Sequence, residues 1–390
     1  MDLNDEKLSN SITITIFCMD GVTFPIELEF KSTVSTLKTK ISSTRNILTC
    51  TMNLFIYGDE SLLIDTMELM ESINIFMLLK NFEEKMVLEL LYDKCNGVDW
   101  CYIDNWKTDT VIQDWYGIRT NSDYKIIYLN LSHNILTGEI PPELGLLSNL
   151  TVLDLYANIL IGEIPPELAQ LSNLNYLHLA ENELIGKIPP KLGQLTNLTY
   201  LNLMCNKLTG EIPHELGLLS NLTELKLSSN NLIGEIPNEL GLLSNLNELD
   251  LSYNNLNGEI PPKLGLLSNL NYLIDLSHNN LTGEIPHELG LLSNLTELKL
   301  SDNNLTGEIP PELGLLSNLI KLDLSYNNLN GEIPPKLGLL SILNELELSH
   351  NNLTGEIPRE LGLLSNLTDL GLDNNKLTGE IPPRFNPFKN

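Results

Sequence analysis

Leucine and isoleucine recur at fixed intervals along the chain from Lys125 onward. An asparagine marks each repeat, and successive markers are 24 residues apart except for one step of 25 residues between Asn254 and Asn279. A sustained period of roughly 20–50 residues predicts a solenoid in which each repeat forms one coil. The eleven markers are Asn134, Asn158, Asn182, Asn206, Asn230, Asn254, Asn279, Asn303, Asn327, Asn351 and Asn375.

Each repeat predicts a short strand, a corner and a return segment. Around Asn230, Leu225 and Leu227 alternate with polar residues, which is typical of a strand with one buried face. The Asn side chain can bind backbone groups that the bend leaves inside the coil, so stacked coils would build a buried asparagine ladder. Gly234 permits a positive φ at the following turn. Seven apolar positions per coil can bury only against neighbouring coils, so a single repeat would not fold.

The pattern L-x-x-L-x-L-x-x-N-x-L-x-G-x-I-P resembles the plant-type leucine-rich repeats, and the match covers residues 125–382 as eleven repeats. This resemblance implies an α/β repeat solenoid, a right-handed superhelix with a parallel sheet on its concave side. It also implies recognition of a protein or peptide rather than catalysis. The one longer repeat has its extra residue within Tyr272–Leu276, which predicts a bulge at the start of that strand.

Residues 83–124 hold all three tryptophans, Trp100, Trp106 and Trp115. Residues 86–92 carry apolar side chains at helical spacing, and the segment resembles the Trp-rich N-terminal cap of the same repeat family. Such a cap shields the open core of the first coil. The alternative is an aromatic ligand cage. At the other end, the tail at 383–390 is too short for a full cap, although its two phenylalanines could cover the last coil.

Residues 1–10 are polar and are expected to be disordered, whereas residues 11–80 predict a small separate domain. Two alternating segments at 12–16 and 24–28 predict a β-hairpin, and Val34, Leu37 and Ile41 form the apolar face of a predicted helix. Strands are predicted at 53–57 and 74–79. This order resembles the ubiquitin-like β-grasp (α+β) domains, with residues 21–41 matching the hairpin and helix without a gap.

Two features bear on what such a domain does. A conjugatable ubiquitin ends in an exposed Gly-Gly, whereas Leu79-Lys80 continues here into the cap helix, so the domain cannot be a modifier. Carrying over the recognition patch of ubiquitin suggests Met19, Phe55, Phe76 and Leu78 on the outward sheet face. An exposed patch of this kind would bind ubiquitin-pathway proteins. Packing of the patch against the cap or first repeat is the alternative.

Charge and composition narrow the partners. The formal net charge is −28 at pH 7, which argues against nucleic acid as a partner. Neither a signal peptide nor a membrane span is recognisable, so we expect an intracellular, cytoplasmic protein. The five cysteines are scattered, only Cys95 and Cys101 lie close in sequence, and reduced thiols are expected.

No catalytic or metal-binding motif is present, so we expect no enzyme activity, cofactor or metal. The six histidines follow the copying of repeats rather than a ligand spacing. A row of leucines occupies the place of Gln170 and Gln194 in the return segments. We expect partial burial of this row under the next coil, whereas exposure would make it an association stripe. Its members are Leu146, Leu218, Leu242, Leu266, Leu291, Leu315, Leu339 and Leu363.

The outward positions of the early strands are rich in aromatic residues, whereas the later ones are charged. Tyr and Met on one rigid face are typical binding anchors. We therefore predict a non-enzymatic adaptor that binds a protein or peptide on this concave face, with the ubiquitin-like domain as a second module. The alternative is a receptor-like sensor. The predicted concave site is Tyr128, Asp154, Tyr156, Tyr176, His178, Tyr200, Asn202 and Met204.

Overall fold

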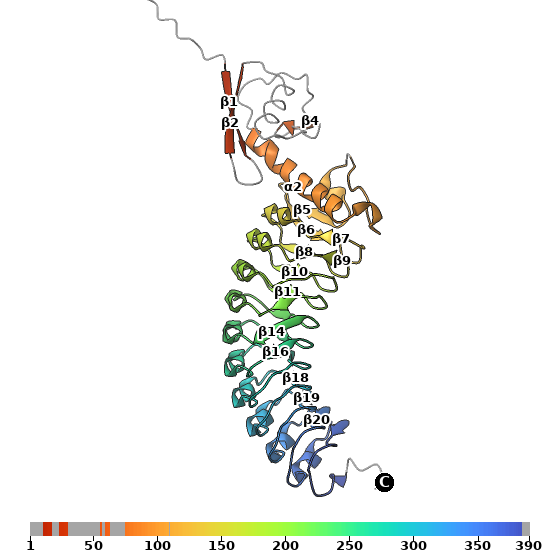
Figure 1. Ribbon diagram of the computed structural model, residues 1–390, viewed down its shortest axis with the longest axis vertical. Coiled ribbons are helices and arrows are strands. Elements are labelled where there is room, and N and C mark those ends of the chain that lie inside the picture. Colours follow the sequence, from red (N-terminus) through yellow and green to blue (C-terminus); the bar gives the residue numbers. More distant parts are fainter. Residues whose placement is uncertain are drawn as a thin grey trace, which may run out of the picture. The chain divides into compact units, whose positions relative to one another are not determined.

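The computed structural model describes residues 11–17, 23–29, 55–56, 59–62, 75–108 and 110–383. The chain divides into two compact units (Figure 1). The first comprises residues 1–90 and 120–126, and the second comprises residues 91–119 and 127–390. None of the helices in the described ranges has the length and apolar character needed to cross a bilayer.

The first unit contains the expected hairpin. Strand β1 (Ser11–Phe17) pairs antiparallel with β2 (Thr23–Glu29), and the register places Ile14 opposite Ile26. The alternation of isoleucine and threonine therefore predicted this element correctly. A second, shorter antiparallel pair joins β3 (Phe55–Ile56) and β4 (Asp59–Leu62).

The strand expected at 74–79 is wrong, because helix α2 occupies Ile75–Lys94. The apolar run that looked like a strand continues without Gly or Pro into residues rich in Leu, Glu and Lys, all good helix formers. One continuous helix therefore forms where a strand and a shorter cap helix were expected. Residues 86–92 lie within it.

This helix also corrects the expected recognition patch. Phe76 and Leu78 lie in α2 and not on a sheet. Phe55 does begin a strand. Met19 and the expected helix with Val34, Leu37 and Ile41 lie outside the described residues. The described strands of this unit do not establish a ubiquitin-like fold.

The second unit begins with a buried aromatic cluster. Trp100 and Trp106 meet edge to face at 4.9 Å, and Trp106 lies 5.0 Å from Trp115. All three rings are buried, and their indole N–H groups donate to backbone carbonyls. Buried rings with satisfied N–H groups leave no open cage, so the arrangement is that of a packed core. Two short 3-10 helices, η2 (Gly97–Asp99) and η3 (Ile112–Asp114), complete this segment.

The repeats build one long sheet, which β5 (Ile118–Thr120) begins. Each coil then adds one strand, and the strands from β6 to β21 pair in parallel (Figure 1). They are β6 (Ile126–Asn130), β8 (Val152–Asp154), β10 (Tyr176–His178), β11 (Tyr200–Asn202), β13 (Glu224–Lys226), β15 (Glu248–Asp250), β17 (Leu273–Asp275), β18 (Glu297–Lys299), β19 (Lys321–Asp323), β20 (Glu345–Glu347) and β21 (Asp369–Gly371).

On the opposite side of the coils lie short 3-10 helices. They are η4 (Pro142–Leu146), η5 (Pro166–Gln170), η6 (Pro190–Gln194), η7 (His214–Leu218), η8 (Asn238–Leu242), η9 (Pro262–Leu266), η10 (His287–Leu291), η11 (Pro311–Leu315), η12 (Pro335–Leu339) and η13 (Arg359–Leu363). Between strand and helix, each coil adds to a second parallel ladder, which contains β7 (Thr137–Glu139), β9 (Ile159–Ile161), β12 (Thr209–Gly210), β14 (Asn231–Glu235) and β16 (Asn255–Asn257) and continues as single bridges. Gly234, at the turn of this ladder, has the expected positive φ of 81°.

Leucines and the marker asparagines fill the interior. In the coil around Asn230, the seven apolar positions from Leu222 to Leu243 are at most 2% exposed. The Asn230 amide donates to the carbonyls of Leu203, Leu227 and Ser228, and its oxygen accepts from the Leu208 N–H. The same hydrogen bonds recur from coil to coil, so the bends leave no buried side-chain polar atom unpaired in the described residues.

The bulge expected in the longer repeat is not in the ladder. Strand β17 pairs with β15 and β18 in unbroken register. The extra residue is accommodated before the strand, where Tyr272 projects outward and is 52% exposed. Leu273 then takes the outward strand position that Glu248 holds in the preceding coil. A loop absorbs an insertion at lower cost than a strand whose neighbours are both in register.

The leucine row of the return segments is more exposed than expected. Seven of its members are 53–69% exposed, and only Leu146 is half-buried. Burial under the next coil is prevented because Leu240 and Leu243 already fill the interior on either side of Leu242. The expectation of partial burial is therefore wrong for these seven residues.

Candidate functional site

The concave face of the first four coils carries two columns of side chains. Parallel pairing in register aligns Tyr128, Val152, Tyr176 and Tyr200 in the first column. Two residues further along each strand, the second column contains Asn130, Asp154, His178 and Asn202. Because neighbouring strands lie about 4.8 Å apart, side chains in one column are in direct contact.

Ring stacking joins these columns into one surface. Tyr176 and Tyr200 stack with centroids 4.3 Å apart, and Tyr156 stacks on His178 at 4.6 Å. His133 contacts the edge of Tyr156 at 4.8 Å. We call Tyr128, Tyr156, Tyr176, His178 and Tyr200 the aromatic patch. All five rings are half-buried, four of them against one another and Tyr128 against Arg119 and Asn130, so their rotamers are fixed before any ligand arrives.

A cation lies at each end of the patch. The Arg119 guanidinium is 4.6 Å from the centre of the Tyr128 ring, and the Lys226 ammonium is 5.8 Å from that of Tyr200. Lys226 is also paired with Glu224 and Glu248, both at 3.1 Å. Burial alone would lower the pKa of Lys226, but these carboxylates outweigh it and the net shift is upward. Lys226 therefore stays charged.

Hydrogen bonds determine the protonation state of His178. The Asn202 oxygen accepts from the Met204 N–H, which fixes the orientation of the amide. The Asn202 Nδ2 then lies 2.9 Å from the Tyr200 hydroxyl and 3.3 Å from His178 Nε2. An amide nitrogen can only donate, so Nε2 must be the unprotonated acceptor. The proton of the neutral ring is on Nδ1, which lies 3.2 Å from the Tyr176 hydroxyl and 3.5 Å from Asp154.

The electrostatics agree with this assignment. Burial lowers the pKa of His178, and nearby Lys226 lowers it further, while Asp154 acts in the opposite direction. Burial also raises the pKa of Tyr176. At neutral pH the His178 and Tyr176 rings are therefore uncharged, with the Asp154 carboxylate beside His178 and the cations Arg119 and Lys226 at the two ends of the patch.

The structure brings the eight predicted concave residues together. Tyr156 and Met204 lie two residues beyond the ends of their strands, in the coils on either side of the one that carries the buried Ala180. Asn202 is only 4% exposed, so it orients Tyr200 and His178 and offers little surface of its own. Val152 separates Tyr128 from the Tyr176–Tyr200 pair.

Three neighbours of this site were missed from the sequence. Asn130 donates to the Tyr128 hydroxyl at 3.2 Å and to Asp154 at 3.0 Å. The repeat register could have identified Asn130, since it occupies the same strand position as Asp154. His133 was noticed only as part of the copied histidines. Arg119 precedes the first repeat, so no periodic signal pointed to it.

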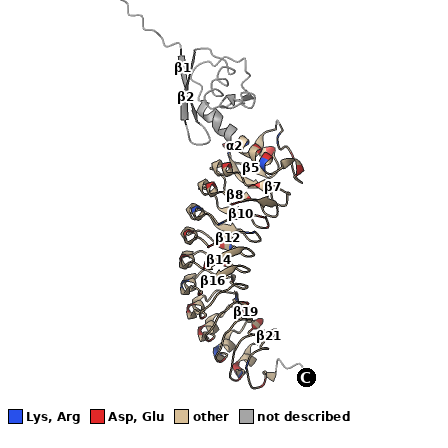
Figure 2. Cartoon of the chain, in the orientation of Figure 1, with Lys and Arg blue, Asp and Glu red and all other residues tan. Residues whose placement is uncertain are grey.

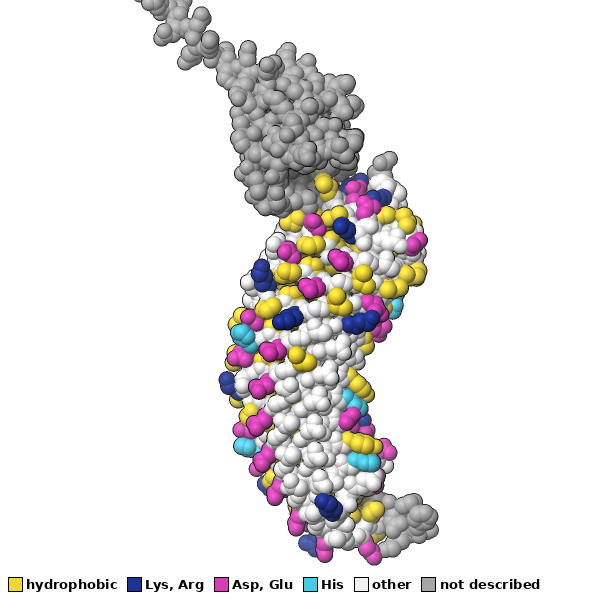
Figure 3. All heavy atoms as spheres, in the orientation of Figure 1, with side chains coloured by type: hydrophobic (Ala, Val, Ile, Leu, Met, Phe, Trp, Pro, Cys, Tyr) yellow, Lys and Arg dark blue, Asp and Glu magenta, His cyan; other side chains and the backbone are white. Residues whose placement is uncertain are grey.

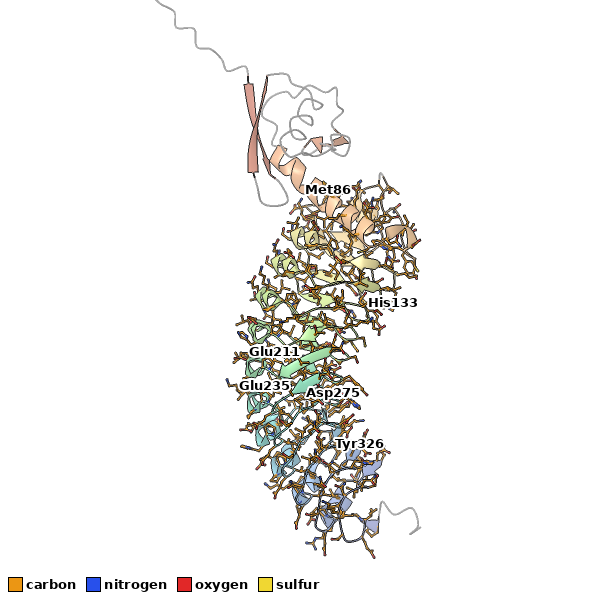
Figure 4. All side chains as sticks on the ribbon, viewed as in Figure 1. Met86, His133, Glu211, Glu235, Asp275 and Tyr326 are labelled. Atoms are coloured by element: carbon orange, nitrogen blue, oxygen red, sulfur yellow. The ribbon has the colours of Figure 1, made fainter. Side chains whose placement is uncertain are left out.

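The concave face of the later coils is charged, and its carboxylates outnumber its lysines. Lys299 lies 2.9 Å from Glu297 and 3.8 Å from Asp275 (Figure 4), and Lys321 lies 2.6 Å from Glu345. Burial raises the pKa of Asp275, although hydrogen bonds from Ser277 act in the opposite direction. The lysines therefore neutralise only part of this face, and its strands form no aromatic cluster comparable with the aromatic patch.

Reactive and metal-binding groups are sparse in the described part of the chain. No three His, Cys, Asp or Glu side chains among those residues are grouped as a metal site would require. Cys95, Cys101 and Cys205 are free thiols. Burial raises the pKa of Cys95 to about 12, which makes this thiol a poor nucleophile at neutral pH.

Fold and site together define a parallel-sheet solenoid with an aromatic patch on its concave face. Family models agree with this class: a leucine-rich repeat region matches residues 121–232, and the Leucine Rich Repeat model matches 245–267, 272–292, 294–316, 318–340, 343–364 and 366–388. The chain belongs to the leucine-rich repeat family. No curated protein sequence matches it significantly.

Solved structures show which members of the family are similar. The ectodomain of the Arabidopsis receptor kinase HAESA, in complex with an IDA peptide hormone, is 33% identical over 78% of this chain and 51% of its own, with a TM-score of 0.69. The plant peptide hormone receptor RGFR1, in complex with RGF2, is 39% identical over 66% and 45%, with a TM-score of 0.60. The chain thus spans about half the length of these receptor structures.

One similar structure is matched over almost its whole length. A plant ice-binding protein is 31% identical to this chain, with a TM-score of 0.64. The match covers 77% of this chain and 97% of that protein.

Proposed function

We propose that this chain is a non-enzymatic recognition protein that binds an extended peptide or protein segment across the aromatic patch. The observation that carries this proposal is the pre-ordered cluster of half-buried rings around His178 on a rigid parallel sheet. Hot spots of binding are enriched in tyrosine held in packed surroundings. Fixing their rotamers in advance lowers the entropic cost of binding.

The direction of the strands supports an extended ligand. A segment lying across the strands would pass from Arg119 over Tyr128 and Tyr176 to Tyr200 and Lys226. It would meet the Arg119 guanidinium at one end, rings in the middle, and at the other end Lys226, which Glu224 and Glu248 already pair. This surface suits a ligand with apolar or aromatic side chains in its middle and a carboxylate near Arg119. The similarity to ectodomains solved with peptide hormones supports the same class of ligand.

A display selection tests this proposal. A phage library of random linear 12-residue peptides would be selected on the full chain, and enriched peptides would be measured by calorimetry. We expect Tyr176→Ala with Tyr200→Ala to weaken them at least ~30-fold, since tyrosine hot spots contribute about 2 kcal/mol or more. Glu297→Ala with Glu345→Ala is the matched control on the later coils and should change affinity by less than about threefold. Equal losses in both variants, or no enrichment at all, would refute the proposal.

The cellular setting separates two versions of this function. An intracellular adaptor and a receptor-like sensor would both use the same patch. The expected ubiquitin-like patch does not support the adaptor, because Phe76 and Leu78 lie in α2. Antibody localisation of the native protein distinguishes the two versions: cytoplasmic staining fits the adaptor, and staining of intact, unpermeabilised cells fits the sensor.

The second ladder supports a different candidate function, binding to ice. In the coils marked by Asn254 to Asn351, two exposed positions of this ladder are occupied by Asn or Thr in every coil. Backbone N–H groups of one coil donate to backbone carbonyls of the preceding coil at 2.7–2.8 Å. A rigid array of identical hydroxyl and amide groups, one coil spacing apart, can match a periodic solid surface. The two columns are Asn255, Asn280, Asn304, Asn328 and Asn352, and Asn257, Thr282, Thr306, Asn330 and Thr354.

This candidate has its own test. Thermal hysteresis and inhibition of ice recrystallisation should be measurable at micromolar concentration. Thr282→Tyr with Thr306→Tyr should abolish both effects, because the bulky rings break the regular surface. Tyr176→Ala with Tyr200→Ala should leave them unchanged. A wild-type chain that shows neither effect would exclude ice binding, and the proposal of peptide binding would be unaffected.

A further inference from the structure

Seven consecutive coils expose a leucine at the end of their outer 3-10 helix. These leucines are 53–69% exposed. We call them the leucine stripe. The corresponding residues in coils 2 and 3 are Gln170 and Gln194, and Leu146 in coil 1 is half-buried. The stripe consists of Leu218, Leu242, Leu266, Leu291, Leu315, Leu339 and Leu363.

The interior of the coils does not need these leucines. Leu168 and Leu171 surround Gln170 and are fully buried, as Leu240 and Leu243 are around Leu242. The fold therefore forms equally well with a polar residue at this position. Single exposed leucines are ordinary on a protein surface, but a contiguous row of seven marks an interaction surface.

Close packing of the outer helices keeps the stripe regular. A Cβ on Gly241 would lie 2.5 Å from the Lys263 carbonyl oxygen of the next coil, and Gly217 and Gly265 are equally close to their neighbours. The outer helices of neighbouring coils are therefore in direct contact. Adjacent leucines follow at one coil spacing, which is at least the roughly 4.8 Å between neighbouring strands, so the whole stripe is about 30 Å long or more.

The two sides of the stripe differ in charge. The residue three positions before each leucine is acidic, as Glu239 is in η8, except in two coils, where it is Lys263 or Lys336. Beyond them Glu211 and Glu235 begin an unbroken column of glutamates (Figures 2 and 4). The residues that follow are uncharged, chiefly Ser-Asn pairs. In Figure 3 acidic side chains recur along one margin of the array.

We propose that the leucine stripe is a homodimer interface, occupied by the stripe of a second copy running in the same direction. A second copy matches the coil spacing at every step. A two-fold axis along the stripe sets each acidic side opposite the uncharged Ser-Asn side of the partner. An antiparallel pair would set acid against acid.

The leucine stripe supplies part of the area that a stable dimer needs. A leucine side chain carries roughly 60–120 Å² of apolar surface, as follows from about 1.5–3 kcal/mol per buried leucine at about 25 cal/mol per Å², and the seven leucines of the stripe are 53–69% exposed. They thus provide roughly 200–600 Å² per copy, and the flanking residues must supply the rest. A standard interface buries about 800 Å² per partner. The aromatic patch lies on the opposite side of the coils and stays open in such a dimer.

Sedimentation of the full chain tests the interface. We expect a monomer–dimer equilibrium at micromolar concentration that strengthens between 50 and 500 mM NaCl, because salt screens the net charge of −28 on each copy. Leu242→Gln with Leu291→Gln and Leu315→Gln should weaken the dimer at least ~100-fold. Glutamine is the residue that coils 2 and 3 carry here, so circular dichroism should be unchanged.

A matched control uses three exposed isoleucines of the second ladder. Ile159→Gln with Ile161→Gln and Ile233→Gln removes side chains that are 47–49% exposed and should leave the dimer intact. A chain that stays monomeric up to about 100 μM at both salt concentrations would overturn the proposal. A dimer that survives the leucine variant, or that salt weakens, would overturn it as well.

Cross-linking tests the orientation. Leu218→Cys, in a chain that also carries Cys101→Ser, places a thiol at one end of the stripe. In the parallel dimer Leu218 faces its own counterpart, so mild oxidation should give a covalent dimer that the Cys101→Ser chain alone does not form. In an antiparallel dimer, residue 218 would instead face residue 363 of the other copy. A chain with Leu218→Cys would then cross-link only to a chain with Leu363→Cys, and this result would overturn the parallel arrangement.

Discussion

Asn303 and Asn304 show how burial gives one residue type two roles. The Asn303 amide donates to the carbonyls of Leu276, Leu300 and Ser301, and its oxygen accepts from the Leu281 N–H. Asn304 is exposed, and only its backbone joins the second ladder, through the Leu281 carbonyl. The period of the sequence identified the first role, because a polar residue that recurs at each bend must satisfy the backbone there.

This difference predicts unequal costs for the same substitution. Asn303→Ala should lower the free energy of unfolding by about 1–3 kcal/mol, because it leaves the buried Leu281 N–H unpaired and removes one of the two hydrogen bonds that each of the three carbonyls accepts. Asn304→Ala should change it by less than about 0.5 kcal/mol, as surface substitutions usually do. Urea unfolding measures both. Similar midpoints for the two variants would show that water replaces the lost hydrogen bonds.

His178 gives the patch a dependence on pH. Its folded-state pKa is lowered, chiefly by burial, so the folded chain binds the proton less readily than the unfolded chain does. The stabilising contribution of neutral His178 is therefore complete above about pH 6.5, the unfolded value, and is lost as the pH falls through the folded pKa. We expect the wild-type chain to lose more stability between pH 7.5 and 5 than a His178→Gln variant does. Parallel losses in urea unfolding would contradict the protonation state assigned above.

At the scale of elements, the repeats were predictable and the junctions were not. Periodic leucines identified strand, corner and return segment in every coil. Helix α2 was misread at its beginning because a short apolar run such as residues 75–79 fits a strand and a helix equally well, and only its continuation decides. The insertion before β17 was misplaced for a related reason. The sequence shows that a residue is added, but not whether the strand or the loop before it takes up the extra residue.

The outer helices provide a prediction at the same scale. Gly241→Ala should lower the free energy of unfolding by about 1–2 kcal/mol, since its Cβ would meet the Lys263 carbonyl oxygen at 2.5 Å and the next coil must shift. Ala169 occupies the equivalent position in η5, so the fold can accommodate such a shift. Gly362→Ala in η13 is the control, because its nearest contact would be Pro382 Cβ at 3.4 Å. It should be neutral or slightly stabilising. Equal effects in thermal unfolding would refute the packing argument.

For the repeats as a whole, the sequence predicted the solenoid and which side chains share its concave face, but not how those side chains interact. Tyr176 and Tyr200 could be aligned from the repeat register alone. The stacking of Tyr156 on His178 and the buried position of Asn202 depend on rotamers that no periodicity encodes. The leucine stripe was visible as a pattern, yet its exposure depended on how the return segment turns. The period of the sequence thus gives the position of each side chain along the solenoid, whereas packing determines its orientation.

Net charge leads to a prediction that involves every coil. The formal charge of −28 includes columns of glutamates at one coil spacing, such as Glu211 and Glu235, whereas ion pairs like that of Lys321 with Glu345 are few. Repulsion should therefore outweigh attraction at low salt, where the screening length is tens of ångströms. In the monomeric variant with glutamine at positions 242, 291 and 315, the urea midpoint at pH 7 should rise between 20 and 300 mM NaCl. Using this variant separates the effect from dimer formation. A falling midpoint would mean that the concave ion pairs, and not the acidic columns, dominate the electrostatics of the solenoid.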